Sequence, residues 1–226
     1  KVGAAIKLVP SANPIPWLPI IDEALTLGDD GHLRHVEAHK ILMGIINERL
    51  GKSFVASEVG IFLNKWPFFH LNFWMGASKL ILSSASGVLG SSIITSFGGN
   101  GNEFGLQVAG LPGRWFTCQA TPPLGNIRSP HTIEGCLGAF GDSPITEGLG
   151  LGAMAQSYSP DMQKLHKGFS PKDILILPKK ILMVEHPLFK KSRARVGMSA
   201  RAVTDLQLTP VLELGIADKY GKDGGL

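Results

Sequence analysis

The chain has 226 residues, of which 44% are hydrophobic and 18% charged, and its formal net charge is +4. This composition predicts one large domain or two small ones with a well-buried core, and it excludes an intrinsically disordered chain. No run of about 18 apolar residues is free of polar interruptions, which excludes a membrane-spanning helix and leaves the apolar segments to the core.

The first part of the chain is predicted to be helical. Residues 1–19 are Pro-rich and form an irregular lead-in, and helical spacing of apolar residues begins at residue 20. Asp29 or Asp30 is placed to cap a long helix, and Gly51 is placed to end it. Ser53 and Ser57 are candidate starts of a short second helix, and residues 71–84 have the pattern of a third. We therefore expect a helical subdomain over residues 20–86.

The second part is rich in glycine and in strand patterns. Fifteen of the 28 glycines lie between residues 87 and 152. Strands are expected at 91–97, 104–108 and 114–119, then at 174–177 paired with 181–184, and finally at 209–215. Residues 120–152 form a long Gly/Pro loop, and loops of this length are commonly functional. Helices followed by an antiparallel meander predict an α+β fold, with residues 87–226 as the second domain.

The strongest local motif is GDSPITEGLGLG at 141–152. Asp142 and Ser143, followed by Thr146 and Glu147, have the pattern of a capped helix start. Free backbone N–H groups at such a start, beginning at Gly141, can hold a phosphate or a carboxylate. The alternative is a capped helix with no ligand. The motif predicts either an anion-binding nest of backbone amides or a purely structural turn.

A second motif, NGNEFG at 100–105, places Asn100 and Glu103 at a turn between two strands. Asn-Gly is a common hairpin signal, so a structural role explains it without a ligand. Glu103 and Asp142 together are a candidate pair of carboxylates for acid–base catalysis.

His32, His35 and His39 share one face if the helix includes all three. This spacing can ligate zinc, but no cysteine neighbours them, and exposed histidines on a helix are the ordinary alternative. We expect that His35 and His39 bind no metal. The two cysteines, Cys118 and Cys136, are too few for a disulfide framework, which favours a cytoplasmic location.

Residues 161–195 carry nine Lys or Arg against three Asp or Glu. Such a basic stretch is compatible with nucleic-acid binding, with a solvated loop, or with attraction of anionic substrates. Few aromatic residues are interleaved with it, which disfavours nucleic acid.

Several strings in a fixed order resemble the AllG/YlbE-like family of oxamate carbamoyltransferase subunits: GSSIIT, NGNEFG, RWFT, GDSPITE and TPVLELGIADK. Gly28, Asp29, His32 and Arg34 also resemble the family's G-D-x-x-H-x-R segment. The resemblance covers residues 18–224 and corresponds to the C-terminal half of longer family members. It implies an α+β fold, interconversion of oxalurate and phosphate with oxamate and carbamoyl phosphate in purine-ring (allantoin) catabolism, and partner subunits that include an FdrA-like protein.

On this resemblance, a small anionic substrate is expected to contact the backbone at 141–148 together with Arg34 and Arg114. Asn100 and Thr117 are expected to orient the amide, and Glu103 or Asp142 to exchange protons. No cofactor is expected, and the chain is expected to work in a hetero-oligomer. Gly99 and Gln107 stand where the family has basic residues, and Glu213 and Asp218 stand where it has Asn and His.

Two other functions fit the same residues. The first is a non-catalytic structural subunit that completes a partner's active site, favoured by the missing basic residues and by an aromatic cluster, Trp66 to Trp74. The second is a metal-dependent hydrolase of small amides that uses the histidine face.

Overall fold

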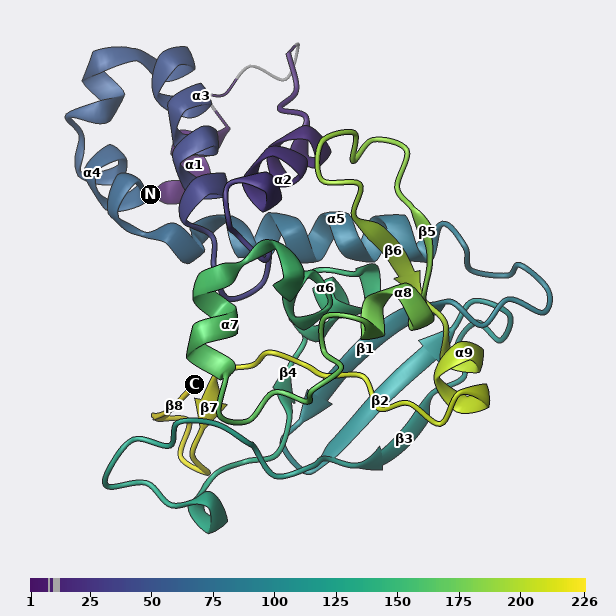
Figure 1. Ribbon diagram of the computed structural model, residues 1–226. Helices are drawn as coiled ribbons and strands as arrows, with labels where there is room; N and C mark the ends of the chain where they lie inside the picture. The colour runs from purple at the N-terminus through teal and green to yellow at the C-terminus, as the bar shows by residue number, and fades with distance from the viewer. Residues whose placement is uncertain (8, 10–12) are drawn as a thin grey trace.

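The computed structural model describes residues 1–7, 9 and 13–226. Its helices and strands follow in chain order (Figure 1). They are α1 (Val2–Ile6), α2 (Trp17–Thr26), α3 (Val36–Val55), α4 (Glu58–Lys65), α5 (Leu71–Ser83), β1 (Ile94–Asn100), β2 (Glu103–Val108), β3 (Phe116–Gln119), β4 (Phe140–Gly141), α6 (Pro144–Leu149), α7 (Pro160–His166), α8 (Leu177–Ile181), β5 (Leu182–Glu185), β6 (Arg195–Met198), α9 (Ala200–Asp205), β7 (Ile216–Ala217) and β8 (Asp223–Gly225). Three short 3-10 helices, η1 (Pro67–His70), η2 (Ile133–Gly135) and η3 (Gly152–Tyr158), complete the described elements.

The helical part forms as its capping residues predict. The Asp29 carboxylate accepts the backbone N–H groups of Glu37 (2.9 Å) and Ala38 (2.7 Å), so it caps α3 from a preceding loop. Ser57 caps α4 by accepting the N–H of Gly60 at 3.1 Å. Gly51, predicted to end the long helix, adopts φ 76° and breaks the helical geometry there, and a second short helical stretch follows it to Val55.

The four-stranded sheet is antiparallel, with the order β3-β2-β1-β4. Phe97 lies opposite Leu106 in the register of β1 and β2, and Gly99 lies opposite Gly141 between β1 and β4. Helices α5 and α6 pack against β1, and the Lys79 ammonium on α5 donates to the Thr95 carbonyl at 2.6 Å. Together with the helices, this sheet confirms the predicted α+β class.

Two predicted strands are absent from this structure. Residues 174–177 do not pair with 181–184, because Pro178 lies in the first turn of α8, and β5 pairs with β6 instead. Residues 209–215 run without regular structure between α9 and β7. Pro210 has no N–H to donate to a ladder, and none of the described sheets includes this segment.

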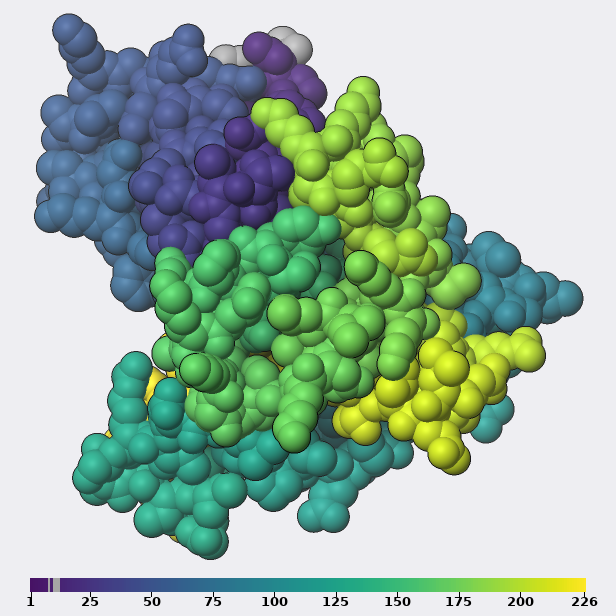
Figure 2. Space-filling view, in the orientation of Figure 1, coloured from purple at the N-terminus to yellow at the C-terminus, as the bar shows by residue number. Residues whose placement is uncertain are grey.

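A single hydrophobic core joins the two predicted domains. Leu42 and Trp74 from the helical part and Ile94, Leu151 and Met198 from the Gly-rich part belong to one buried cluster. Residues of α6 to α8 and their loops, in green, fill the centre of the face that is turned toward the viewer (Figure 2). None of the helices within the described ranges has the length and apolar character needed to cross a membrane.

Candidate active site

The loop at residues 28–35 carries a buried carboxylate that shapes it. One oxygen of Asp30 accepts the N–H groups of His32 (2.5 Å) and Leu33 (2.9 Å), and the other accepts that of Arg34 (3.1 Å). Burial, reinforced by the charge of Glu213, raises the pKa of Asp30 to about 7. These bonds hold the loop in a turn that directs the His32 ring inward.

His32 forms a fully buried pair with Glu147 of α6. Its Nδ1 lies 2.8 Å from Glu147 Oε1, and the two side chains are 2% and 0% exposed. Burial alone lowers the pKa of His32, but the hydrogen bond and charge of Glu147, with the charges of Asp30 and Glu213, raise it above its ordinary value. Burial also raises the pKa of Glu147, so both groups compete for one proton. We place that proton on His32, because Glu147 Oε1 also accepts a backbone N–H.

That backbone N–H belongs to Glu213 and lies 3.0 Å from Glu147 Oε1. The Glu213 side chain extends the network: its Oε1 accepts from Gln156 Nε2 at 2.8 Å and lies 3.2 Å from His166 Nδ1. All of these side chains are buried, and the second carboxylate oxygens of Glu147 and Glu213 have no hydrogen-bond partner. The result is a buried acid–histidine network that runs from His32 to His166.

A cavity of about 380 Å³ lies at the Glu213 end of this network. Gln156, His166 and Glu213 line it, together with residues 121–124, 137–140, 169–171, 209–212, 214–216 and Leu226. Its size suits a small molecule, and its lining is mostly apolar with a few convergent polar groups. The network therefore presents a carboxylate, an imidazole and an amide to a cavity able to hold a small substrate.

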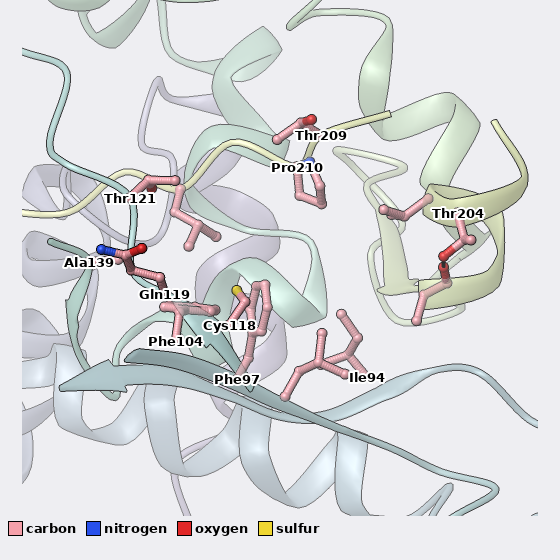
Figure 3. A pocket seen from close by; sticks show the side chains of 14 residues that line it. Ile94, Phe97, Phe104, Cys118, Gln119, Thr121, Ala139, Thr204, Thr209 and Pro210 are labelled. Atoms are coloured by element: carbon pink, nitrogen blue, oxygen red, sulfur yellow. Dashed lines mark hydrogen bonds between the residues drawn. The ribbon is translucent and has the colours of Figure 1, made fainter. Parts of the chain in front are cut away.

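A second cavity, of about 290 Å³, is drawn in Figure 3. Phe97, Phe104 and Cys118 from the sheet form its floor, and Thr209 and Pro210 lie across from them (Figure 3). Both cavities share five lining residues: Thr121, Ala139, Thr209, Pro210 and Leu212. The described lining of neither cavity includes Lys or Arg.

The exposed helical histidines that were the ordinary alternative to a zinc site are not found, because His32, His35 and His39 are all buried. His32 precedes helix α3, His35 is the N-cap of α3, and His39 lies within it. The rings of His35 and His39 instead contact His70, with centroid separations of 4.8 and 5.8 Å. Burial lowers the pKa of His35 to about 3 and that of His70 to about 4. Within residues 1–7, 9 and 13–226, no group of three or more His, Cys, Asp or Glu is arranged to hold a metal ion.

The structure places the sequence-predicted site residues in separate regions. Glu147 and Thr146 are buried in α6, and only Glu147 reaches the acid–histidine network. Asn100 accepts the N–H of Glu103 at 2.7 Å in the turn after β1. Gly141 lies on β4, which pairs with β1, and it is opposite Gly99. Exposed Asp142 and half-buried Ser143 follow it.

The remaining three predicted residues lie elsewhere. Arg34 contacts Asp29 at 2.7 Å and Asp161 at 3.3 Å, so two carboxylates neutralise it. Arg114 and Thr117 are exposed, Thr117 on β3 and Arg114 just before it, over the ring of Phe116. Strands β3 and β4 are opposite edges of the sheet, about 14 Å apart at ~4.8 Å per strand. Arg114 and Gly141 are therefore too far apart to contact the same small anion. None of the ten predicted residues is among the described lining of either cavity.

Sequence reasoning did not select Asp30, Gln156, His166 or Glu213 as site residues. A signal was present at Glu213, which lies between Leu212 and Leu214 in an otherwise apolar segment. A charged residue enclosed by apolar neighbours is either paired or functional when buried. Gln156 and His166 carry no comparable signal.

The family follows from a match between residues 2–143 and the family model described as oxamate carbamoyltransferase subunit AllG. The chain belongs to the AllG family. It is 28% identical over 210 residues to the oxamate carbamoyltransferase subunit AllG of Escherichia coli K12, which covers 87% of this chain and 50% of that protein. It is 34% identical over 155 residues to YahG, an uncharacterized protein of the same organism, which covers 66% of this chain and 32% of that protein.

The fold of this AllG-family chain is also similar to that of a solved structure. It matches a conserved protein of unknown function from Enterococcus faecalis V583 with a TM-score of 0.83 and 27% identity, covering 97% of this chain and 54% of that one. The chain thus spans about half the length of the AllG relative and of the solved structure, and about a third of YahG.

Proposed function

We propose that this chain is part of a carbamoyltransferase subunit that interconverts oxalurate and phosphate with oxamate and carbamoyl phosphate, in purine-ring catabolism in the cytoplasm. Membership of the AllG family supports this reaction class. The observation that carries the proposal is the placement of Glu213, His166 and Gln156 on the wall of the 380 Å³ cavity. We assign this cavity to the amide substrate.

The chemistry requires a positioned base. The amide nitrogen of oxamate attacks the carbamoyl carbon, a new C–N bond forms, and phosphate leaves with the electron pair of the broken C–O bond. The nitrogen loses one proton, which the His166–Glu213 pair accepts. Gln156 holds Glu213 in place by donating to its Oε1. The unpartnered Glu213 Oε2 is a suitable acceptor for a second amide hydrogen.

The departing phosphate needs positive charge, and the described cavity linings supply none from Lys or Arg. We therefore propose that another part of the complete enzyme supplies that charge, either a partner subunit such as an FdrA-like protein or sequence corresponding to the rest of the longer relatives. The turn at 141–143 stays a separate proposed anion site, with Glu103 or Asp142 as the proposed carboxylate that exchanges protons.

The absence of Lys and Arg from the described cavity linings favours a second candidate function. In this alternative the chain is a non-catalytic subunit that completes a partner's active site. In that case the cavity binds no reactant by itself, and its residues affect assembly rather than turnover.

The first prediction separates the two candidates. In the complete enzyme with its partner subunits, Glu213→Gln and His166→Phe should each lower kcat by roughly 10²–10⁴-fold, because each disables the pair that takes a proton from the amide nitrogen in one direction and returns it in the other. The measurement is carbamoyl phosphate formation from oxalurate and phosphate. Glu185→Gln makes the same chemical change at an exposed site paired with Arg193 and serves as the control.

Unchanged kcat in both variants, with subunit assembly intact by light scattering, would contradict the catalytic assignment. Loss of assembly with wild-type kcat in the remaining complex would favour the structural subunit instead.

A further inference from the structure

Residues 209–215 form a strap between the two cavities. Thr209, Pro210 and Leu212 line both cavities, so the strap is their common wall. In Figure 1 it is part of the yellow segment that crosses the molecule between α9 and β7, and in Figure 3 Thr209 and Pro210 lie across the cavity from the sheet. The strap has no helix or strand of its own.

A single residue anchors the strap by hydrogen bonds. Among the described residues, the hydrogen bonds of the strap are those of Glu213: its N–H donates to Glu147 Oε1, and its Oε1 accepts from Gln156 Nε2. His166 Nδ1 lies 3.2 Å from the same carboxylate oxygen. On either side of the strap, regular bonding resumes, at Leu208 N–H to the Val203 carbonyl and in β7. The remaining contacts of the strap are side-chain packing by Val211 and Leu212 against the core.

Such a segment opens locally more easily than the structure around it. Glu213 is 4% exposed, whereas Thr209 and Gly215 are exposed and the other strap residues, 210–212 and 214, are only half-buried. The anchor is itself incompletely satisfied, because the second oxygens of Glu213 and Glu147 lack partners. Buried carboxylate oxygens without partners destabilise the closed arrangement relative to one in which water reaches them.

We propose that the strap is a gate latched by Glu213, and that its opening joins the two cavities into one site. The idea that the joined site admits both reactants rests on the proposed function. The gate itself does not, because the strap and its anchor are properties of the chain without substrate.

Site-resolved amide hydrogen exchange on the whole chain tests the gate without any substrate. In the wild type, the Glu213 amide should exchange roughly tenfold or more slowly than the amides of Val211, Leu212 and Leu214, because it alone is hydrogen-bonded. Glu213→Ala and Gln156→Leu each remove the side-chain part of the latch. Both should speed exchange at amide 213 by roughly 10- to 100-fold, the effect of losing a hydrogen bond to a charged group. Thr209→Ser, on the same strap and outside the latch, is the control.

Amides paired between β1 and β2 report global unfolding in every variant. Uniform protection along the strap of the wild type would overturn the proposal, whatever the variants do. Unchanged exchange at amide 213 in a variant whose β1–β2 amides behave as in the wild type would overturn it as well. Failure of the activity prediction would leave this result intact, since no turnover enters the experiment.

Discussion

Replacing His32 with Leu should lower the free energy of unfolding by about 3–5 kcal/mol at pH 7, because removing one partner of a buried pair leaves the other charge uncompensated. Glu147 is 0% exposed, and its bond with His32 is 2.8 Å long. With His32 gone, Glu147 keeps the N–H of Glu213 as its described hydrogen-bond donor. Urea unfolding followed by circular dichroism gives the free energy.

Adding Glu147→Gln to His32→Leu should recover most of that loss. Glutamine is neutral and its side-chain oxygen still accepts the Glu213 N–H, so the strap keeps its backbone anchor. Stability of the single variant should also rise as the pH falls, because protonation neutralises Glu147. A loss below about 1 kcal/mol, with no recovery in the double variant, would show that the pair is not held as described.

The second large effect concerns acid pH and the histidine cluster of His35, His39 and His70. The pKa of His70 is about 4 and that of His35 about 3 in the folded chain, against an ordinary value of 6.5. Below pH 6.5 the unfolded chain binds protons that the folded chain does not, so each group lowers stability as the pH falls. The positive charges that lower the pKa of His35 are those of His70, His32 and His39. The charge of His39 lowers the pKa of His70 in the same way. Protonation of one ring therefore opposes protonation of the next.

Asp30 has the opposite effect and raises stability as the pH falls. Its pKa is raised to about 7, so between pH 7 and about 4 the folded chain holds a proton that the unfolded chain does not. A comparison with His70→Leu removes this contribution, because Asp30 is common to both proteins. Stability of the wild type should fall by about 1 kcal/mol per pH unit more steeply than that of the variant between pH 6 and 4.5. At pH 7 the variant should be no less stable, because neither ring nitrogen of His70 has a hydrogen-bond partner.

Urea unfolding at half-unit pH steps measures both slopes. Parallel slopes for wild type and His70→Leu would mean that His70 is protonated in the folded chain, contrary to its buried, partnerless setting.

Local patterns in the sequence predicted the features that depend on neighbouring residues. The sequence predicts Asp29 or Asp30 as one cap and Ser53 or Ser57 as the next, and the structure uses Asp29 and Ser57. The strands around the NGNEFG turn follow from alternation and turn chemistry. Glu147 was selected within a glycine-rich motif. In the structure, packing explains one of those glycines: a side chain at Gly152 would overlap the Glu147 carboxylate.

The acid–histidine network could not be predicted in the same way. His32 and Glu147 are 115 positions apart in the chain, and Glu147 and Glu213 are 66 apart, so no local pattern links them. The histidine spacing was misleading because Asp30 holds His32 in a turn before the helix begins. Residues 209–215 have strand-like composition, but a strand needs a hydrogen-bonded neighbour, and this segment pairs with no described strand.

The central claim, that the 380 Å³ cavity holds the amide substrate, is tested most directly by titrating the isotope-labelled chain with oxamate, oxalurate and carbamoyl phosphate and following its backbone amide resonances. The account predicts shifts at Gln156, His166 and Glu213 with oxamate or oxalurate, abolished by Glu213→Ala. The claim would be contradicted by shifts confined to Gly141, Ser143 or Arg114. It would also be contradicted if none of the three compounds caused shifts in the presence of the partner subunits.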